Sequence, residues 1–239
     1  MNVKHLLAVT LFSAVLSLGS SAQIADQAMK LAGQGKNGLT EKEAADAIKE
    51  ALVKGTGQSV ALVSKSDGYF GNPEIKIPFP ESARVIETKL RSMGMGKQVD
   101  EAILSLNRAA EDAAKSAEPI FVGAVKKMTV TDAVHIIEGK DNAATQYLSN
   151  TTTPELKTSF TPMIKTSLDR VNATKCWMEL INIYNKIPLV KKQNPDLVSY
   201  TTDQAIKGLF IMVAKEEVKI RQNPAARTTE LLKKAFGQK

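Results

Sequence analysis

The feature that most constrains the fold is the heptapeptide "GLFIMVA" at residues 208–214, inside a predicted helix over about 200–222. These residues are apolar on every side of a helix, whereas an amphipathic surface helix keeps one polar face. We therefore expect this helix to run through the centre of a bundle, with neighbouring helices covering all its sides. The predicted fold class is all-α, a single bundle-like domain built around a buried central helix.

Helix-start signals recur along the rest of the chain. The run Thr40-Glu41-Lys42-Glu43 reads as a capping box, followed by helical apolar spacing to about Lys65. Thr129 with Asp132 in the first turn predicts a second capped start, and Gly139 its end. Thr153-Pro154-Glu155 predicts that a new helix begins there. Further helices are expected over 82–93, from Val99 to before Pro119, and over 120–128, 174–186 and 224–236, for eight to ten in all.

One segment breaks this pattern: "SDGYFGNPEIKIPFP", residues 66–80, is rich in Gly and Pro. Within it Ile75, Ile77 and Phe79 alternate with polar residues or Pro, which is strand periodicity. Because Pro lacks a backbone N–H, the segment would be an unpaired extended piece, here called the strap. A short hairpin is expected through Asp67-Gly68 or Gly71-Asn72. Two interpretations stay open, a structural cap over the bundle and the lid or wall of a binding groove.

The N-terminus has the three-part layout of a secretory signal. A short positive segment precedes an apolar run at residues 6–18, and Gly19-Ser20-Ser21-Ala22 supplies small residues before a cleavage site. That run is shorter than the roughly 20 residues of a spanning helix. We expect residues 1–22 to be a signal peptide removed after Ala22, and residues 23–239 to form one exported, periplasmic, soluble domain without a transmembrane segment.

The composition fits an exported protein that does not depend on disulfide bonds for its stability. The predicted mature part, 217 of 239 residues, is long enough to bury about 70% of its unfolded surface. Its single Cys176 has no partner for an intrachain disulfide; a buried inert thiol is favoured over a reactive or dimer-forming one. Net charge is +7, or +6 after Lys4 is lost. The basic residues are scattered among acidic ones, so a solvated surface of mixed charge is the default interpretation. If the charge serves binding, lipid headgroups, acidic glycans and cell-wall polymers are the expected partners rather than nucleic acid, and an envelope protein is a further possible partner.

The usual catalytic signatures are missing. The predicted mature chain has one histidine, His135, and no nucleophile motif, phosphate-cradling glycine loop or paired cysteines. Asp132 and His135 could offer two metal ligands from adjacent turns, but an exposed helical histidine is favoured. The sequence therefore predicts no catalytic residue, no metal and no cofactor.

Polar clusters at the borders of apolar stripes are the candidate sites. Asn107, Arg108 and Glu111 lie in "LNRAAEDA", and Glu216, Glu217 and Arg221 follow the apolar heptapeptide. A third cluster has Asp141, Thr145 and Gln146 at a helix start. Ordinary border hydrogen bonds and ion pairs are one interpretation. The other makes a groove of the predicted binding residues, which are Tyr69, Phe70, Asn107, Arg108, Glu111, Glu217 and Arg221.

Three functions remain in competition. The first is a non-enzymatic periplasmic binding or scaffold protein for an apolar or anionic envelope component. The second is a hydrolase of cell-wall or glycan material that uses Glu111 with Glu216 or Glu217; it requires two carboxyl groups about 5–9.5 Å apart. The third is a structural subunit of an envelope complex, which would carry a large exposed apolar patch.

Several blocks of the chain together resemble a known family. "LNRAAEDA", "IFVGAVKKMTVTDAVHIIEGKDNAATQYL" and "GLFIMVAKEEVKIRQNPAARTTELLKKAFG" are similar to the signature blocks of domain-of-unknown-function family 4197, and "DGYFGNPEIKIPFP" is similar to its link between two long helices. The resemblance covers essentially the whole predicted mature chain. It implies a helical envelope protein of double-membraned bacteria and implies no activity.

Overall fold

The computed structural model describes residues 40–171, 177–178, 181–182, 185–186, 192, 196–223 and 233. The predicted signal peptide, Cys176 and most of the predicted helices over 174–186 and 224–236 lie outside these residues.

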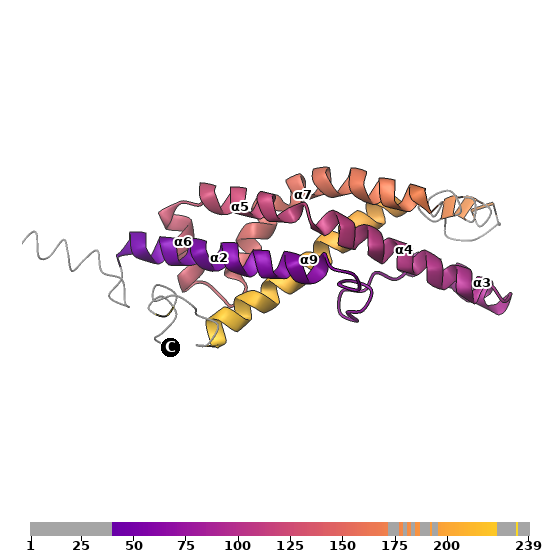
Figure 1. The fold of residues 1–239 in the computed structure, drawn as a ribbon, viewed down its shortest axis with the longest axis horizontal. Coiled ribbons are helices and arrows are strands. Elements are labelled where there is room, and N and C mark those ends of the chain that lie inside the picture. Colours follow the sequence, from indigo (N-terminus) through magenta and orange to yellow (C-terminus); the bar gives the residue numbers. More distant parts are fainter. Residues whose placement is uncertain are drawn as a thin grey trace, which may run out of the picture.

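The described part of the chain is all-α, as the sequence predicted, and contains no strand. It forms an elongated bundle in which most helices run along the long axis and α9 crosses it (Figure 1). The elements in chain order are α2 (Glu41–Val63), the 3-10 turn η1 (Glu81–Ala83), α3 (Arg84–Ser92), α4 (Gly96–Ala114), α5 (Ala117–Lys127), α6 (Val130–Glu138), α7 (Ala143–Arg170) and α9 (Leu197–Gln222).

Local capping sets the starts of two helices. Thr40 Oγ1 accepts a hydrogen bond from the Glu43 N–H at 3.2 Å, and the Glu43 carboxylate accepts one from the Thr40 N–H at 2.9 Å. Thr129 and Asp132 form the same reciprocal pair at the start of α6, and these hydrogen bonds lower the pKa of Asp132. Both predicted capping starts are thereby confirmed.

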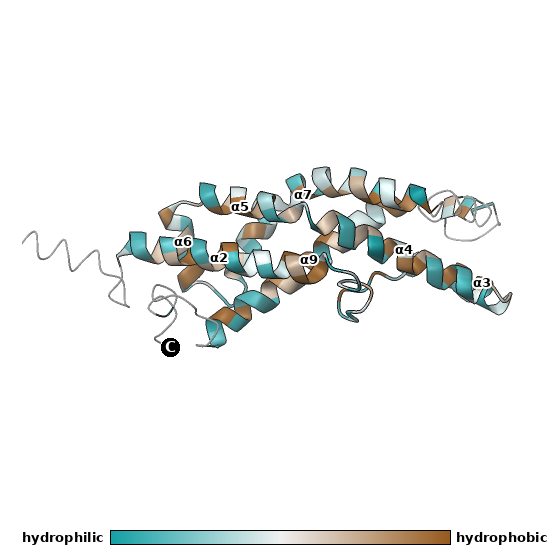
Figure 2. Cartoon of the chain, viewed as in Figure 1, coloured by the Kyte–Doolittle hydropathy of each residue, from teal (hydrophilic) through white to brown (hydrophobic). Residues whose placement is uncertain are grey.

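Helix α9 packs against α2, α4 and α7 and so contributes to most of the core. One contiguous cluster of buried apolar side chains draws on α2, the strap, α4, α5, α6, α7 and α9. Among its largest fully buried members are Ile48, Leu106, Phe121, Leu156 and Phe160. Some apolar residues, such as Val85 and Met93, remain exposed. The described helices carry both hydrophobic and hydrophilic residues along their length (Figure 2).

The expectation that residues 208–214 are buried on every side is wrong for one flank. Gly208, Leu209 and Val213 are buried, but Phe210, Ile211, Met212 and Ala214 keep part of their surface exposed. Ile211 and Ala214 lie where α7 and α9 leave a hollow between them. The helix is therefore central to the packing, yet one apolar edge of it reaches the surface.

The expectation of a new helix at Thr153 is also wrong, because α7 continues from Ala143 to Arg170 through Pro154 and Pro162. Its buried stripe keeps i+4 spacing across Pro154, with Thr152 and Leu156 on either side of it. Thr153 does not act as an N-cap; its hydroxyl donates to the Ser149 carbonyl at 2.6 Å. Burial of this stripe outweighs the cost of the missing proline N–H groups.

Close packing at Gly208 yields a stability prediction. A Cβ there would lie 2.7 Å from Cε1 of the buried Tyr69 ring, which packs directly on α9. Gly208→Ala should lower the free energy of unfolding by about 1–3 kcal/mol, because overpacking a dense core forces its neighbours to move. Urea unfolding measures this change.

Gly123→Ala in α5 is the matched control. A Cβ at Gly123 meets nothing within 4 Å. Higher helix propensity should raise the stability of that variant by up to about 1 kcal/mol. Equal effects of the two substitutions would contradict the packing at Gly208.

Candidate functional site

The strap follows α2 as a series of tight turns. Gly71 N–H donates to the Asp67 carbonyl at 3.0 Å, Asn72 N–H to that of Tyr69 at 3.1 Å, and Lys76 N–H to that of Asn72 at 2.8 Å. The expected hairpin does not form, because these bonds close single turns rather than pairing two strands. Asp67 adopts a positive φ of 63°. A Cβ at Gly68 would overlap the carbonyl oxygen of Val63, so only glycine fits there.

Helix α9 anchors one side of the strap. The Tyr69 side chain is fully buried, and its hydroxyl donates to the Ala205 carbonyl at 2.6 Å. Burial, with a smaller contribution from Glu111, raises the pKa of Tyr69, so the phenol stays protonated and remains a donor. Glu74 pairs with Lys215, and the Tyr200 hydroxyl donates to the Pro78 carbonyl at 2.9 Å.

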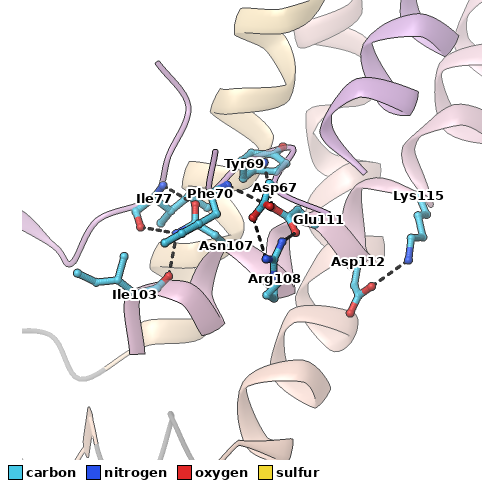
Figure 3. Close-up of polar contacts among 10 residues, drawn as sticks. All are labelled: Asp67, Tyr69, Phe70, Ile77, Ile103, Asn107, Arg108, Glu111, Asp112 and Lys115. Atoms are coloured by element: carbon cyan, nitrogen blue, oxygen red, sulfur yellow. Dashed lines mark hydrogen bonds and ion pairs between the residues drawn. The ribbon is translucent and has the colours of Figure 1, made fainter. Parts of the chain in front are cut away.

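Helix α4 anchors the other side (Figure 3). Glu111 Oε1 accepts hydrogen bonds from the backbone N–H groups of Tyr69 at 3.0 Å and Phe70 at 3.2 Å. Arg108 bridges Glu111 Oε2 at 2.6 Å and Asp67 Oδ1 at 2.8 Å. The guanidinium thereby ties the first turn of the strap to the same carboxylate that accepts its N–H groups.

Asn107 completes this cluster. Its Oδ1 accepts from the Ile77 N–H at 2.8 Å, while its Nδ2 donates to the Ile77 and Ile103 carbonyls, each at 2.8 Å (Figure 3). Asn107 is fully buried, so a side chain at this position has to satisfy both polar groups of Ile77. The structure therefore brings five of the seven predicted binding residues into one cluster, in which Tyr69, Phe70 and Arg108 contact Glu111 while Asn107 binds Ile77 and Ile103.

Apolar contacts lie beneath these hydrogen bonds. Ile75, Ile77 and Phe79 are buried, whereas Glu74, Lys76 and Pro78 are exposed. Phe79 stacks on Trp177, the only tryptophan of the chain, with ring centroids 5.2 Å apart. The strap thus covers part of the core with alternate side chains.

The other two predicted residues form a separate cluster where α9 meets α6 and α7. Glu217 accepts hydrogen bonds from the Ala144 N–H at 3.0 Å and the Thr145 N–H at 2.8 Å, at the start of α7. Arg221 donates to Glu217 at 2.9 Å and to the Ile136 carbonyl at 2.8 Å. Both side chains are less than a tenth exposed, so the ion pair is buried, and each charged group also has hydrogen-bond partners on the backbone.

The third predicted cluster does not assemble. Thr145 donates its hydroxyl to Glu217 at 2.7 Å, whereas Asp141 and Gln146 are exposed.

These contacts bear on the chemistry that the carboxylates could perform. Glu111 and Glu217 each hold an arginine and two backbone N–H groups, and Glu216 lies 3.4 Å from the Lys219 ammonium. The carboxylate oxygens of Glu111 and Glu217 are thus engaged in contacts that hold the strap to α4 and the start of α7 to α9. The described residues contain no group of three or more His, Cys, Asp or Glu side chains that could hold a metal ion.

Two cavities border α9. A small one of about 30 Å³ lies beside Glu217 and Arg221, with room for little more than one water molecule. The larger, here called the α7–α9 hollow, has a volume of about 480 Å³ and opens to solvent. It is lined by Ser149, Thr153, Lys157, Asp203, Ile206, Lys207, Phe210, Ile211 and Ala214. This site was not predicted from the sequence, although Lys207 directly precedes the apolar heptapeptide that forms part of it.

The fold and its two polar clusters define an all-helical protein. A non-helical strap holds its helix α9 beside α4, and a buried ion pair holds α9 beside α7. Residues 38–237 match the family model described as protein of unknown function (DUF4197). Because the match spans most of the chain, the protein belongs to this family, as the resemblance implied. Neither curated proteins nor solved structures gave a significant match. Within the described residues, no helix combines the length and apolarity needed to cross a bilayer.

The strap contacts predict a specific cost for removing Asn107. Asn107→Ala leaves the buried N–H and C=O of Ile77 without partners, and each such group costs about 1–3 kcal/mol. We expect a loss of at least about 2 kcal/mol in the free energy of unfolding. Quenching of Trp177 fluorescence by acrylamide should also rise, because Phe79 on the strap shields that ring.

Asp112→Ala is the control in the same helix, since Asp112 and Lys115 form an exposed pair at 2.9 Å. Its effect should stay within about 0.5 kcal/mol. If both variants keep wild-type stability and quenching, Asn107 does not anchor the strap.

Proposed function

We propose that the protein is a non-enzymatic binding protein of the bacterial envelope, and that the α7–α9 hollow takes an envelope component with an apolar part. The observation that supports this most directly is the exposed flank of an otherwise buried apolar run. Phe210, Ile211 and Ala214 line the hollow together with Ile206, and the exposed Lys157 and Lys207 also belong to its lining. Burial of apolar surface contributes about 25 cal/mol per Å², so an occupant that covers this flank gains affinity from it.

The contacts of the strap are consistent with a binding site in the hollow that exists before the ligand arrives. The backbone and side chains of the strap are engaged by α4 and α9, and none of the residues that line the hollow belongs to the strap. In this proposal the strap is a structural cap. Tyr69, Phe70, Asn107, Arg108 and Glu111 hold α9 beside α4 and do not touch the ligand, and Glu217 with Arg221 does the same where α9 meets α7.

The compartment is part of the proposal. Export rests on the charged, apolar and small-residue segments at positions 1–22. An exported protein with positive net charge and an apolar hollow encounters lipids, acidic glycans and envelope proteins.

A binding role predicts that ligand is retained on purification. Protein isolated from a bacterial envelope extract should carry an additional mass in native mass spectrometry. Ile211→Gln should abolish it, because a polar side chain then replaces an apolar one in the lining of the hollow. Val85→Gln, at a side chain that is 67% exposed and lines neither cavity, is the control and should retain the mass. Equal retention by both variants would place the ligand outside the hollow.

Export predicts a defined N-terminus. When the full chain is expressed in a double-membraned bacterium, mass spectrometry of the periplasmic fraction should identify an N-terminal peptide that begins at Gln23. Ala22→Lys should leave the precursor unprocessed, because the residue before the cleavage site must be small. Recovery of the wild-type chain in the cytoplasm with residues 1–22 attached would overturn this.

A further inference from the structure

We propose that the ligand of the α7–α9 hollow is an anion with a single acyl chain, with its head group at Lys207 and its chain along Phe210, Ile211 and Ala214. This inference rests on the proposed function and adds the chemical class of the ligand.

The lining of the hollow changes along its length from charged to apolar side chains. On α9 the lining residues run from Asp203 and Lys207 to Ile211 and Ala214, all near one face of the helix. Lys157 on α7 pairs with Asp203 at 2.8 Å, while Glu217 contacts Ala144 at the start of α7, so the two helices run antiparallel. The charged residues therefore gather at one end. The 11 helical steps from Asp203 to Ala214 span about 16.5 Å at about 1.5 Å each.

The charged end of the hollow carries two lysines and one aspartate, Lys157, Lys207 and Asp203. Asp203 is paired with Lys157. Lys207 is exposed and, among the described residues, has no ion pair or hydrogen bond. One positive charge is thus left beside an apolar surface. An anionic head group there gains an exposed ion pair, which corresponds to roughly a two- to fivefold gain in affinity.

The other end of the hollow offers the apolar side chains of Phe210, Ile211 and Ala214. A fully buried methylene strengthens binding about fourfold. Because the hollow is open on one side, we expect about twofold for each added methylene. Carboxylate and phosphate heads satisfy Lys207 equally well, so the shared feature is an acyl chain with a small anionic head.

The test measures dissociation constants by titration calorimetry, below the micellar concentration of each amphiphile, on the mature chain. The probes are octanoate, laurate, dodecyl phosphate and the uncharged dodecyl maltoside. Laurate should bind about tenfold or more tightly than octanoate, and two- to fivefold more tightly than dodecyl maltoside. Comparison of laurate with dodecyl phosphate shows which head group is preferred.

Variants locate the two parts of the ligand. Lys207→Gln should weaken laurate and dodecyl phosphate two- to fivefold and leave dodecyl maltoside unchanged. Lys126→Gln, at an exposed lysine of α5 outside both cavities, should change none of them. Ile211→Gln should weaken all twelve-carbon probes.

The outcomes separate this inference from the proposed function. If dodecyl maltoside binds as tightly as laurate and Lys207→Gln has no effect, the anionic class is wrong, while binding in the hollow stands. If Ile211→Gln weakens no probe, the hollow is not the site and both proposals fail. If no amphiphile binds and Ile211→Gln converts a dimer to a monomer in analytical ultracentrifugation, a second copy of the chain covers the flank, and both again fail.

Discussion

Backbone groups that leave a helix but stay buried must find acceptors and donors elsewhere, and this requirement governs the architecture around the strap. Between α2 and η1 the chain forms only single hydrogen-bonded turns and no continuous helix, yet Tyr69 and Ile77 are buried. Side chains of α4 supply the partners: Glu111 for the N–H groups of Tyr69 and Phe70, and Asn107 for both polar groups of Ile77. Because Tyr69 also donates to α9, one short segment fixes two long helices relative to each other.

A second restraint acts farther along α9. The carboxylate of Glu217 replaces the missing partners of two N–H groups at the start of α7, where the helix dipole also favours a negative charge. Arg221 balances that charge and reaches the Ile136 carbonyl. A buried ion pair contributes little net stability, but it penalises every arrangement that separates its members. With α9 held at Ala205 and at Glu217, the stretch between them has a defined position beside α7. A preformed hollow costs little ordering on binding.

Sequence reasoning succeeded where the cause is local. The Thr40 and Thr129 starts depend on residues three apart, and both helices begin where the capping pattern predicted. It failed at Thr153-Pro154, where the same kind of local signal is overridden by a buried stripe that runs along the whole of α7. The ion pairs Arg108–Glu111 and Glu217–Arg221 follow from helical spacing. The other partners of Asn107, Glu111, Glu217 and Arg221 include backbone groups 30 to 85 positions away in the chain. No spacing rule provides such pairings. The hollow was missed for the same reason, since it exists only where two antiparallel helices diverge.

The apolar heptapeptide at 208–214 has to be explained by two different surroundings at once. Its buried side needs Gly208, which lets the Tyr69 ring approach the helix, and needs Leu209 and Val213 for the core. Ile211 also packs against the core, but like Ala214 it keeps part of its surface exposed, so core packing accounts for only part of their apolar surface. Lys207 and Lys215 flank the run, but Lys215 is engaged by Glu74 of the strap, which leaves Lys207 beside the exposed apolar edge. A purely apolar occupant would leave that ammonium without a partner, and a purely ionic one would leave the edge in water. An amphiphilic anion satisfies both, and this complementarity is the physical basis of the proposed ligand class.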